Sequence, residues 1–276
     1  MTSARTIVRI LGCGSSGGVP RLGNRWGSCD PSEPKNRRSR CSILVVNQNE
    51  QGEQTSLLVD TSPDMREQLL AAECRHLDAV LYTHDHADQT HGIDDLRQIC
   101  YMMRKRIPVY FDDVTRHSLV SRFSYVFEQS PESAYPAILD AREMPPLGEA
   151  FAVSGAGDPI SVIPFLLEHG PTVQALGFRF GSIAYTPDVS DIPAPAVAAL
   201  QGIDTWIIDA LRPDPHPTHF HLDLTLEWIA KIKPRRAILT NMHISMDYKT
   251  LRNSLPDHVI PAYDGMEIIM ETTSKA

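Results

Sequence analysis

The chain has 276 residues, with 26 Lys or Arg and 34 Asp or Glu, so its net charge is -8 at pH 7. The length fits one large or two small domains, and the 42% of hydrophobic residues is enough for a sizeable core. The acidic balance argues against broad nucleic-acid binding, which depends on surplus Lys and Arg.

Membrane insertion and secretion are also disfavoured by the sequence. No apolar run approaches the roughly 18 residues that a membrane span needs, and the glycine-rich N-terminus is too short for a secretory signal. The cysteines are odd in number and show no paired spacing, namely Cys13, Cys29, Cys41, Cys74 and Cys100. We therefore expect reduced thiols and a cytoplasmic location.

The order of predicted elements indicates mixed α/β layers. Short β-branched runs bounded by Gly, Pro, Asp or Asn predict strands at 6–12, 42–47, 56–61, 79–84, 107–112, 160–170, 176–188, 205–211, 236–243 and 259–270. The run at 176–188 is read as a hairpin that turns at Gly181 and Ser182. Helical patterns cover 63–74, 93–104, 114–127, 223–232 and 248–255. The Pro-, Ala- and Gly-rich stretch 129–157 predicts a long loop or a small insertion.

Polar side chains follow the apolar strands at the points where these strands stop. They are Asp60, His84, His86, His169, Asp188, Asn241 and His243. Strand ends are where α/β sheets place functional sites, because loops converge there on a rigid frame. Imidazole and carboxylate are ligands for zinc, manganese or iron, and alternate spacing places His84, His86 and Asp88 on one face if the strand continues. The sequence therefore predicts a metal site.

These motifs resemble the metallo-β-lactamase fold superfamily. The resemblance rests on "THDHAD" after an apolar strand, then His169, Asp188 and the late "LTNMH". It implies an α/β (α+β) fold, a four-layer αββα sandwich, as a single domain over residues 1–276 with metals at one edge of the sheets. The segments "GCGSSGGVP" and "PAYDGMEI" resemble the phosphoribosyl 1,2-cyclic phosphate phosphodiesterase branch. The cysteine cluster that holds a structural zinc in that branch is missing, so we do not expect that zinc.

The resemblance also implies a ligand set with two departures. One metal would bind His84, His86 and His169, with Asp188 bridging to a second metal. The second would use Asp88, Asp188, the position held by Gln89 and a histidine after the late strand, where this chain has Asn241. Both altered positions thus belong to the same metal.

Three interpretations of the second position follow. It is empty, or it is rebuilt with His243, or the amide oxygens of Gln89 and Asn241 make an oxygen-rich site that favours manganese or magnesium. We favour a filled first site and a weaker second site that includes His243. The expected cofactors are one or two divalent ions, zinc or manganese.

The predicted reaction is attack of a metal-bound hydroxide on a phosphodiester phosphorus. Asp88 would orient the hydroxide or accept its proton. In the related branch a histidine before a late helix acts as general acid; His219 matches it best and His221 is the second choice. Arg38 and Arg40 are candidate phosphate ligands, and Asp60 is expected to support the metal ligands through hydrogen bonds.

The predicted function is therefore a metal-dependent phosphodiesterase that acts on a small cyclic or nucleotide-like substrate. Three alternatives remain open at this stage: a non-catalytic metal- or nucleotide-binding protein, an RNA-processing nuclease, and a thioester or lactone hydrolase. We expect no membrane partner, and a homodimer is left open. The exact substrate and the metal are not fixed by the sequence.

Overall fold

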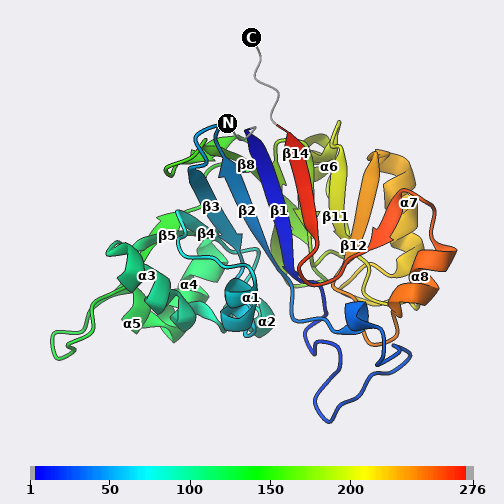
Figure 1. Cartoon of the computed structure of the whole chain (residues 1–276), viewed down its shortest axis with the longest axis horizontal. Coiled ribbons are helices and arrows are strands. Elements are labelled where there is room, and N and C mark those ends of the chain that lie inside the picture. The colour runs from blue at the N-terminus through cyan, green and yellow to red at the C-terminus, as the bar shows by residue number, and fades with distance from the viewer. Residues whose placement is uncertain (1–3, 272–276) are drawn as a thin grey trace.

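The computed structural model describes residues 4–271 and contains two β-sheets with helices on their outer sides (Figure 1). The strand order of the first sheet is β14 (Glu267–Glu271), β1 (Arg5–Gly12), β2 (Ser42–Gln48), β3 (Gln54–Val59), β4 (Ala79–Leu81), β5 (Ile107–Phe111) and β6 (Leu139–Glu143). The order of the second is β13 (Val259–Pro261), β12 (Arg236–Thr240), β11 (Thr205–Asp209), β10 (Ile183–Thr186), β9 (Gln174–Phe180), β8 (Ile160–Glu168) and β7 (Phe151–Val153).

Each sheet mixes antiparallel and parallel pairs. Strands β1, β2 and β3 pair antiparallel, whereas β3 to β6 pair in parallel. The second sheet repeats this plan, with antiparallel β8, β9 and β10 followed by parallel β10 to β13. Strand–helix connections permit the parallel pairs and place helices on the sheet faces.

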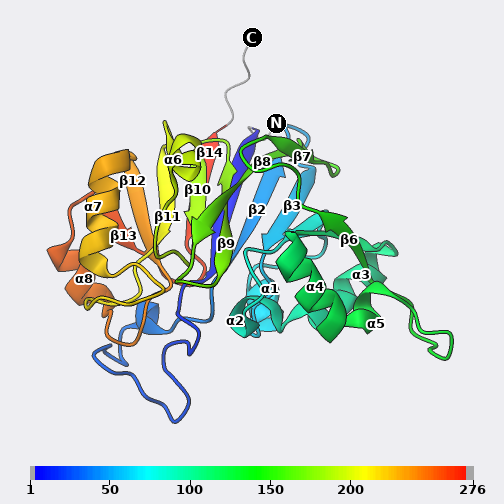
Figure 2. The same cartoon turned by 180° about the vertical axis from the view of Figure 1, so that it is seen from behind.

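The helices divide between the two sheets, as the front and back views show (Figures 1 and 2). Beside the first sheet lie α1 (Met65–Ala71), α2 (Ala87–Thr90), α3 (Leu96–Met103), α4 (Asp113–Arg122) and α5 (Ser124–Phe127). Beside the second lie α6 (Ala194–Leu200), α7 (Leu222–Ile232) and α8 (Tyr248–Ser254). Two short 3-10 helices, η1 (Pro34–Asn36) and η2 (Ile93–Asp95), complete the set. Within residues 4–271, no helix combines the length and apolar character needed to cross a bilayer.

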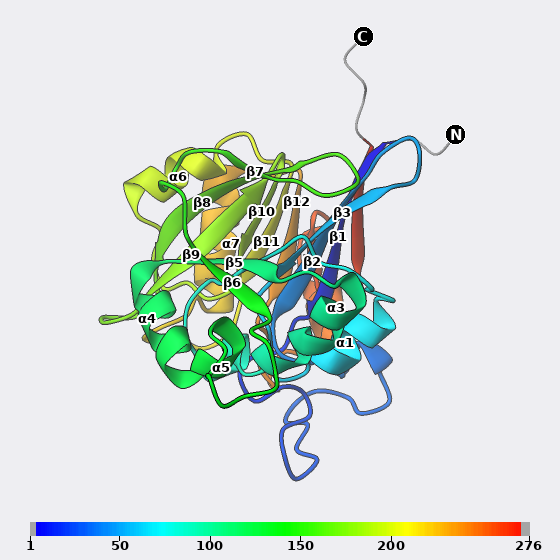
Figure 3. The ribbon, with the colours of Figure 1, turned by 90° about the vertical axis from the view of Figure 1, so that its left-hand side faces the viewer.

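Side-chain alternation in the first sheet explains the layers. Val45 and Leu57 point into the core between the two sheets, while Leu44 and Leu58 belong to a second core with Met65 of α1. Because successive strand residues face opposite sides, a strand that is apolar at every position is buried on both faces. The four layers are visible when the molecule is seen from the side (Figure 3). The predicted αββα sandwich is confirmed.

Three features depart from the sequence prediction. The stretch 129–157 is not loop throughout, because β6 and β7 lie in it and each extends the edge of a sheet. Helix α6 was not predicted, since its sequence "APAVAAL" follows Pro193, has a second proline in its first turn and shows no polar alternation. The last predicted strand is two strands, β13 and β14, which belong to different sheets.

Candidate metal centre

The predicted polar residues meet where strands of both sheets end. Asp60 follows β3, His84 and His86 follow β4, and His169 follows β8. Like His169, three further residues come from strands of the second sheet: Asp188 follows β10, Asn241 follows β12, and Asp209, which was not predicted, ends β11. Asp60 and Asn241 adopt left-handed backbone conformations, with φ of 63° and 58°, which turn the chain sharply at the sheet edge.

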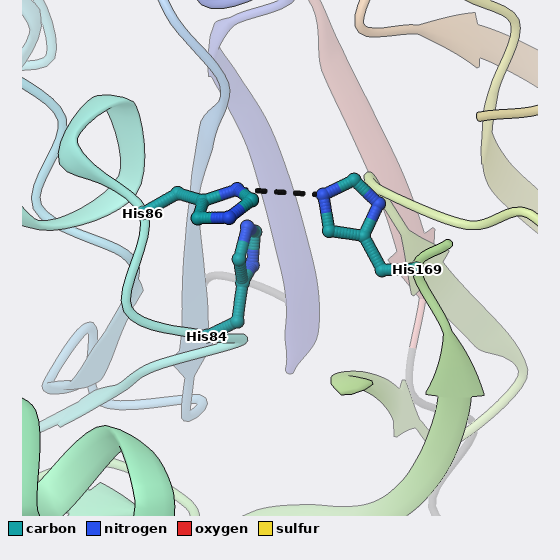
Figure 4. Close-up of side chains that lie close together, drawn as sticks. All are labelled: His84, His86 and His169. Carbon is teal, nitrogen blue, oxygen red and sulfur yellow. Dashed lines mark hydrogen bonds between the residues drawn. The ribbon is translucent and has the colours of Figure 1, made fainter. Parts of the chain in front are cut away.

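Three histidines form the centre of the site, and Figure 4 shows their rings facing one another. One ligand nitrogen from each of His84, His86 and His169 lies within 4.8 Å of the others. Their ring centroids are 4.5, 5.0 and 5.1 Å apart. The Nε2 atom of His84 is buried and has no hydrogen-bond partner among residues 4–271. Three converging imidazoles with an unpartnered buried nitrogen fit a divalent metal ion.

Neighbouring groups fix which ring nitrogen is free in two of these histidines. Nδ1 of His169 lies 2.8 Å from the carbonyl oxygen of Thr218, so this nitrogen carries the proton and Nε2 presents its lone pair. Nδ1 of His84 lies 3.0 Å from Oγ1 of Thr83, whose hydroxyl proton is directed at Asp60, 2.9 Å away. His84 therefore donates to Thr83, which leaves Nε2 of His84 for a metal.

The environment also keeps the rings of His84 and His169 neutral. Burial lowers the pKa of His84 well below its usual range, and the nearby imidazoles lower it further. Burial, with the charge of His219, lowers the pKa of His169 to about 4. Neutral imidazole is the form that coordinates metals.

Asp60 acts on the histidines through Thr83. Its carboxylate is fully buried and accepts the Thr83 backbone N–H at 2.8 Å as well as the hydroxyl. The side chain thus holds the start of the "THDHAD" loop rather than a histidine directly.

Asp188 lies beside the histidines and is almost completely buried. Its two oxygens accept different amide donors: Oδ2 lies 3.1 Å from Nε2 of Gln89, and Oδ1 lies 3.1 Å from Nδ2 of Asn241. Ligand atoms of His169, Asp188 and His219 also lie within 4.8 Å of one another. Burial raises the pKa of Asp188, and the neighbouring His219 opposes this shift.

His219 is held by a buried acid that the sequence reasoning missed. Its Nδ1 lies 2.9 Å from Oδ2 of Asp209 and 3.7 Å from Oδ1 of Asp188. Burial alone would lower the pKa of His219, but the carboxylates of Asp209, Asp188 and Asp88 raise it to about 9. The ring is therefore protonated at neutral pH. Asp209 ends an apolar strand, and this signal could have identified it.

These groups open into a cavity of about 550 Å³. Asp88 and His219 lie on its wall, together with Arg21 and Arg212. His221 does not line it; it is the N-cap residue of α7, and its carbonyl accepts hydrogen bonds from Thr225. Of the two candidate acids, the structure brings only His219 to the histidine cluster.

The structure corrects the positions of the predicted phosphate ligands. Neither Arg38 nor Arg40 lines the histidine cavity; both border a separate, larger cavity of about 950 Å³. Arg38 is only 2% exposed and donates to Asn36, and Arg40 pairs with Asp64 at 3.0 Å. The compact basic run is therefore used in folding the loop that precedes β2. Arg21 and Arg212 are the arginines at the histidine site.

His243 does not join the predicted second metal position. It lies on the cavity wall, but its Nδ1 is 3.0 Å from Oγ of Ser245, and it belongs to neither group of converging ligand atoms in the described chain. The prediction assumed that strand alternation continues through residue 243. It ends because β12 stops at Thr240 and Asn241 turns with a positive φ.

Comparison with known proteins agrees with this geometry. Residues 55–244 match the family model of the beta-lactamase superfamily domain. A crystal structure of a diphosphatase from the PhnP family is 32% identical, with a TM-score of 0.82 over 96% of this chain and 97% of that one. Zinc-bound PqqB from Methylobacterium extorquens is 20% identical, with a TM-score of 0.69 over 95% of this chain and 99% of that one, and supports the fold alone.

A curated relative carries a different name. An octanoyltransferase of Porphyromonas gingivalis is 31% identical over 264 residues, which is 95% of this chain but 51% of that protein. The chain thus spans about half the length of this relative. The match of the family model over most of the chain, on a sandwich with its histidines at the sheet edge, shows that the protein belongs to the beta-lactamase superfamily domain family, the metal-dependent hydrolases of the metallo-β-lactamase fold.

Proposed function

We propose that the protein is a metal-dependent phosphodiesterase that hydrolyses a small cyclic or nucleotide-like phosphodiester. The observation that carries the proposal is one cavity that combines a three-histidine cluster, His219 paired with Asp209, Asp88 and two arginines. Guanidinium groups suit phosphoryl oxygens, because they are permanently charged and can donate two parallel hydrogen bonds. The similarity to a diphosphatase supports a substrate with a phosphoryl group.

His84, His86 and His169 would hold a divalent ion, which would supply an acidified water and offset charge on phosphoryl oxygens. The protein's own groups then have separate tasks. Arg21 and Arg212, which line the same cavity, bind the anionic substrate.

Asp88 and His219 move the protons. Asp88, half-buried at the start of α2, orients the attacking water and accepts its proton. His219 donates a proton to the leaving oxygen. Its Nδ1–H is directed at Asp209, so the proton for transfer is on Nε2, and Asp209 keeps the ring charged and oriented.

The cavity favours this chemistry over acyl transfer. Among the described residues that line it, only Pro171, Val173 and Leu211 are apolar, so there is no apolar channel for an eight-carbon chain. The name of the Porphyromonas gingivalis relative belongs to a protein about twice as long, and the activity of that protein need not reside in the matching half.

Hydrolysis assays with manganese or zinc test the proposal. We expect turnover of bis(p-nitrophenyl) phosphate and of a cyclic nucleotide, and no comparable turnover of p-nitrophenyl acetate or octanoate. Hydrolysis of the esters alone would contradict the phosphodiesterase proposal and favour an acyl hydrolase. Inactivity on all substrates, with metal bound, would favour the non-catalytic alternative, and cleavage of precursor tRNA alone would favour the nuclease.

A further inference from the structure

At the second metal position of this centre, the side chains that would bind an ion form hydrogen bonds with one another instead. Asp188 is the carboxylate that would be shared between two ions, yet each of its oxygens is 3.1 Å from a side-chain amide nitrogen, one from Gln89 and one from Asn241. In the structure both amides present their NH2 groups to Asp188, and its two oxygens are the acceptors. The amide oxygens therefore point away from Asp188.

This orientation disfavours an oxygen-rich second site. To act as metal ligands, the oxygens of Gln89 and Asn241 would have to turn towards the metal and face the carboxylate of Asp188. Such a turn would give up two hydrogen bonds to a buried carboxylate, which are worth more than bonds between neutral groups. All three side chains are nearly completely buried, so little of their surface is open to solvent that could replace these bonds.

The other nearby ligands are also engaged. Nδ1 of His219 is bound to Asp209 at 2.9 Å, and Nε2 of His169 faces His86 at 3.4 Å within the three-histidine cluster. Asn241 Nδ2 also lies 3.2 Å from Nδ1 of His219, but both atoms are donors once His219 donates to Asp209, so the bond of this amide is to Asp188.

A rebuilt site with His243 is disfavoured as well. The side chain of His243 is bound to Ser245 and lies among the positive charges of Arg21 and Arg212, which oppose a second cation. The buried atoms without a hydrogen-bond partner in the described chain include Nε2 of His84 in the three-histidine cluster and Oε1 of Gln89, but Nε2 of His84 converges with two further imidazoles.

We propose that this protein binds a single catalytic metal, at His84, His86 and His169, and that Gln89 and Asn241 are positioning residues whose amides hold Asp188 where a second ion would otherwise hold it. Amides are neutral, so the centre carries less positive charge than a two-metal site. The inference concerns metal content and is independent of which substrate the protein hydrolyses.

Metal stoichiometry tests the proposal without an activity assay. The wild type is loaded with excess zinc or manganese, separated from free metal by gel filtration, and measured by inductively coupled plasma mass spectrometry. We expect about one equivalent per chain for the wild type and for His243→Ala. We expect about two for the double variant Gln89→His/Asn241→His, which restores two imidazoles.

The controls separate the alternatives. His84→Ala should lose the single equivalent of metal. Far-UV circular dichroism identifies any variant that has not folded. If the double variant does not fold, the metal contents of the wild type and of His243→Ala still test the proposal. Two equivalents in the wild type would overturn the proposal, and a fall from two to one in His243→Ala would establish the rebuilt site instead. A folded double variant that still holds one equivalent would refute the role given to the amides.

Discussion

The hydroxyl of Thr83 should contribute several kilocalories per mole to the free energy of unfolding, because it links a buried acid to a metal ligand. It lies 2.9 Å from Oδ2 of Asp60 and 3.0 Å from Nδ1 of His84, and all three residues are nearly inaccessible to solvent. Thr83→Val keeps the shape but removes the hydroxyl, which leaves one acceptor and one donor without partners. Each costs about 1–3 kcal/mol. We therefore expect the metal-free protein to lose about 2–5 kcal/mol of unfolding free energy after the small gain from the added methyl.

The same change should weaken the metal site. Without the hydroxyl, the ring of His84 is free to rotate or change tautomer, and loss of such a supporting bond typically lowers metal affinity by roughly 10- to 100-fold. Urea denaturation of metal-free protein measures the first effect, and competition with a chromogenic zinc chelator measures the second. Thr83→Ser is the matched control, since it keeps the hydroxyl and loses only a methyl, at about 1 kcal/mol. Wild-type stability and zinc affinity in Thr83→Val would refute this assignment of His84.

Three further predictions concern residues of the cavity wall and the N-cap residue of α8. His219→Gln should reduce kcat by roughly 10²- to 10⁴-fold with unchanged metal content, whereas a parallel loss of metal would place His219 among the ligands. Arg21→Ala and Arg212→Ala should raise KM for phosphodiesters and leave zinc affinity unchanged; an unaltered KM in both would remove the arginines from substrate binding. Asp247→Ala should cost about 1 kcal/mol, because it caps α8 by accepting the N–H of Thr250.

The contribution of Asp247 to stability should also depend on pH. Burial would raise the pKa of Asp247, but hydrogen bonds from Thr250, Asp30 and Asn36 outweigh it and lower the pKa to about 2. A depressed folded-state pKa means that the stabilisation is present above the ordinary value near 3.8 and is lost as the pH falls towards 2. The stability difference between wild type and Asp247→Ala, measured by urea denaturation, should therefore shrink between pH 4 and pH 2. A constant difference over that range would contradict the explanation.

Local patterns in the sequence predict mixed α/β layers and the histidine cluster, whereas the αββα sandwich is predicted only through the family resemblance. Apolar strands that end in a polar residue mark the edge where loops converge, and this rule places Asp60, His84, His169 and Asp188 together. The same rule would have found Asp209. The arginines could not be assigned in this way, because a basic run does not reveal whether the chain will bury it. Arg38 is buried near Cys29, whereas Arg21 belongs to a glycine-rich loop whose path back to the cavity only the folded chain shows.

The state of the second metal position could not be predicted from sequence patterns and depends on the geometry of the folded chain. The joint change at Gln89 and Asn241 marks one metal position, and the sequence alone leaves three interpretations of it. The choice depends on two features that residue spacing does not reveal. The positive φ of Asn241 takes His243 off the strand face. The two oxygens of Asp188 accept hydrogen bonds from the amides of Gln89 and Asn241. A pair of neutral donors can replace a cation only if the carboxylate between them is buried, since water would otherwise compete for both oxygens. Asp188 meets that condition, so the burial of this carboxylate supports the proposed centre with one ion, held in order by the two amides.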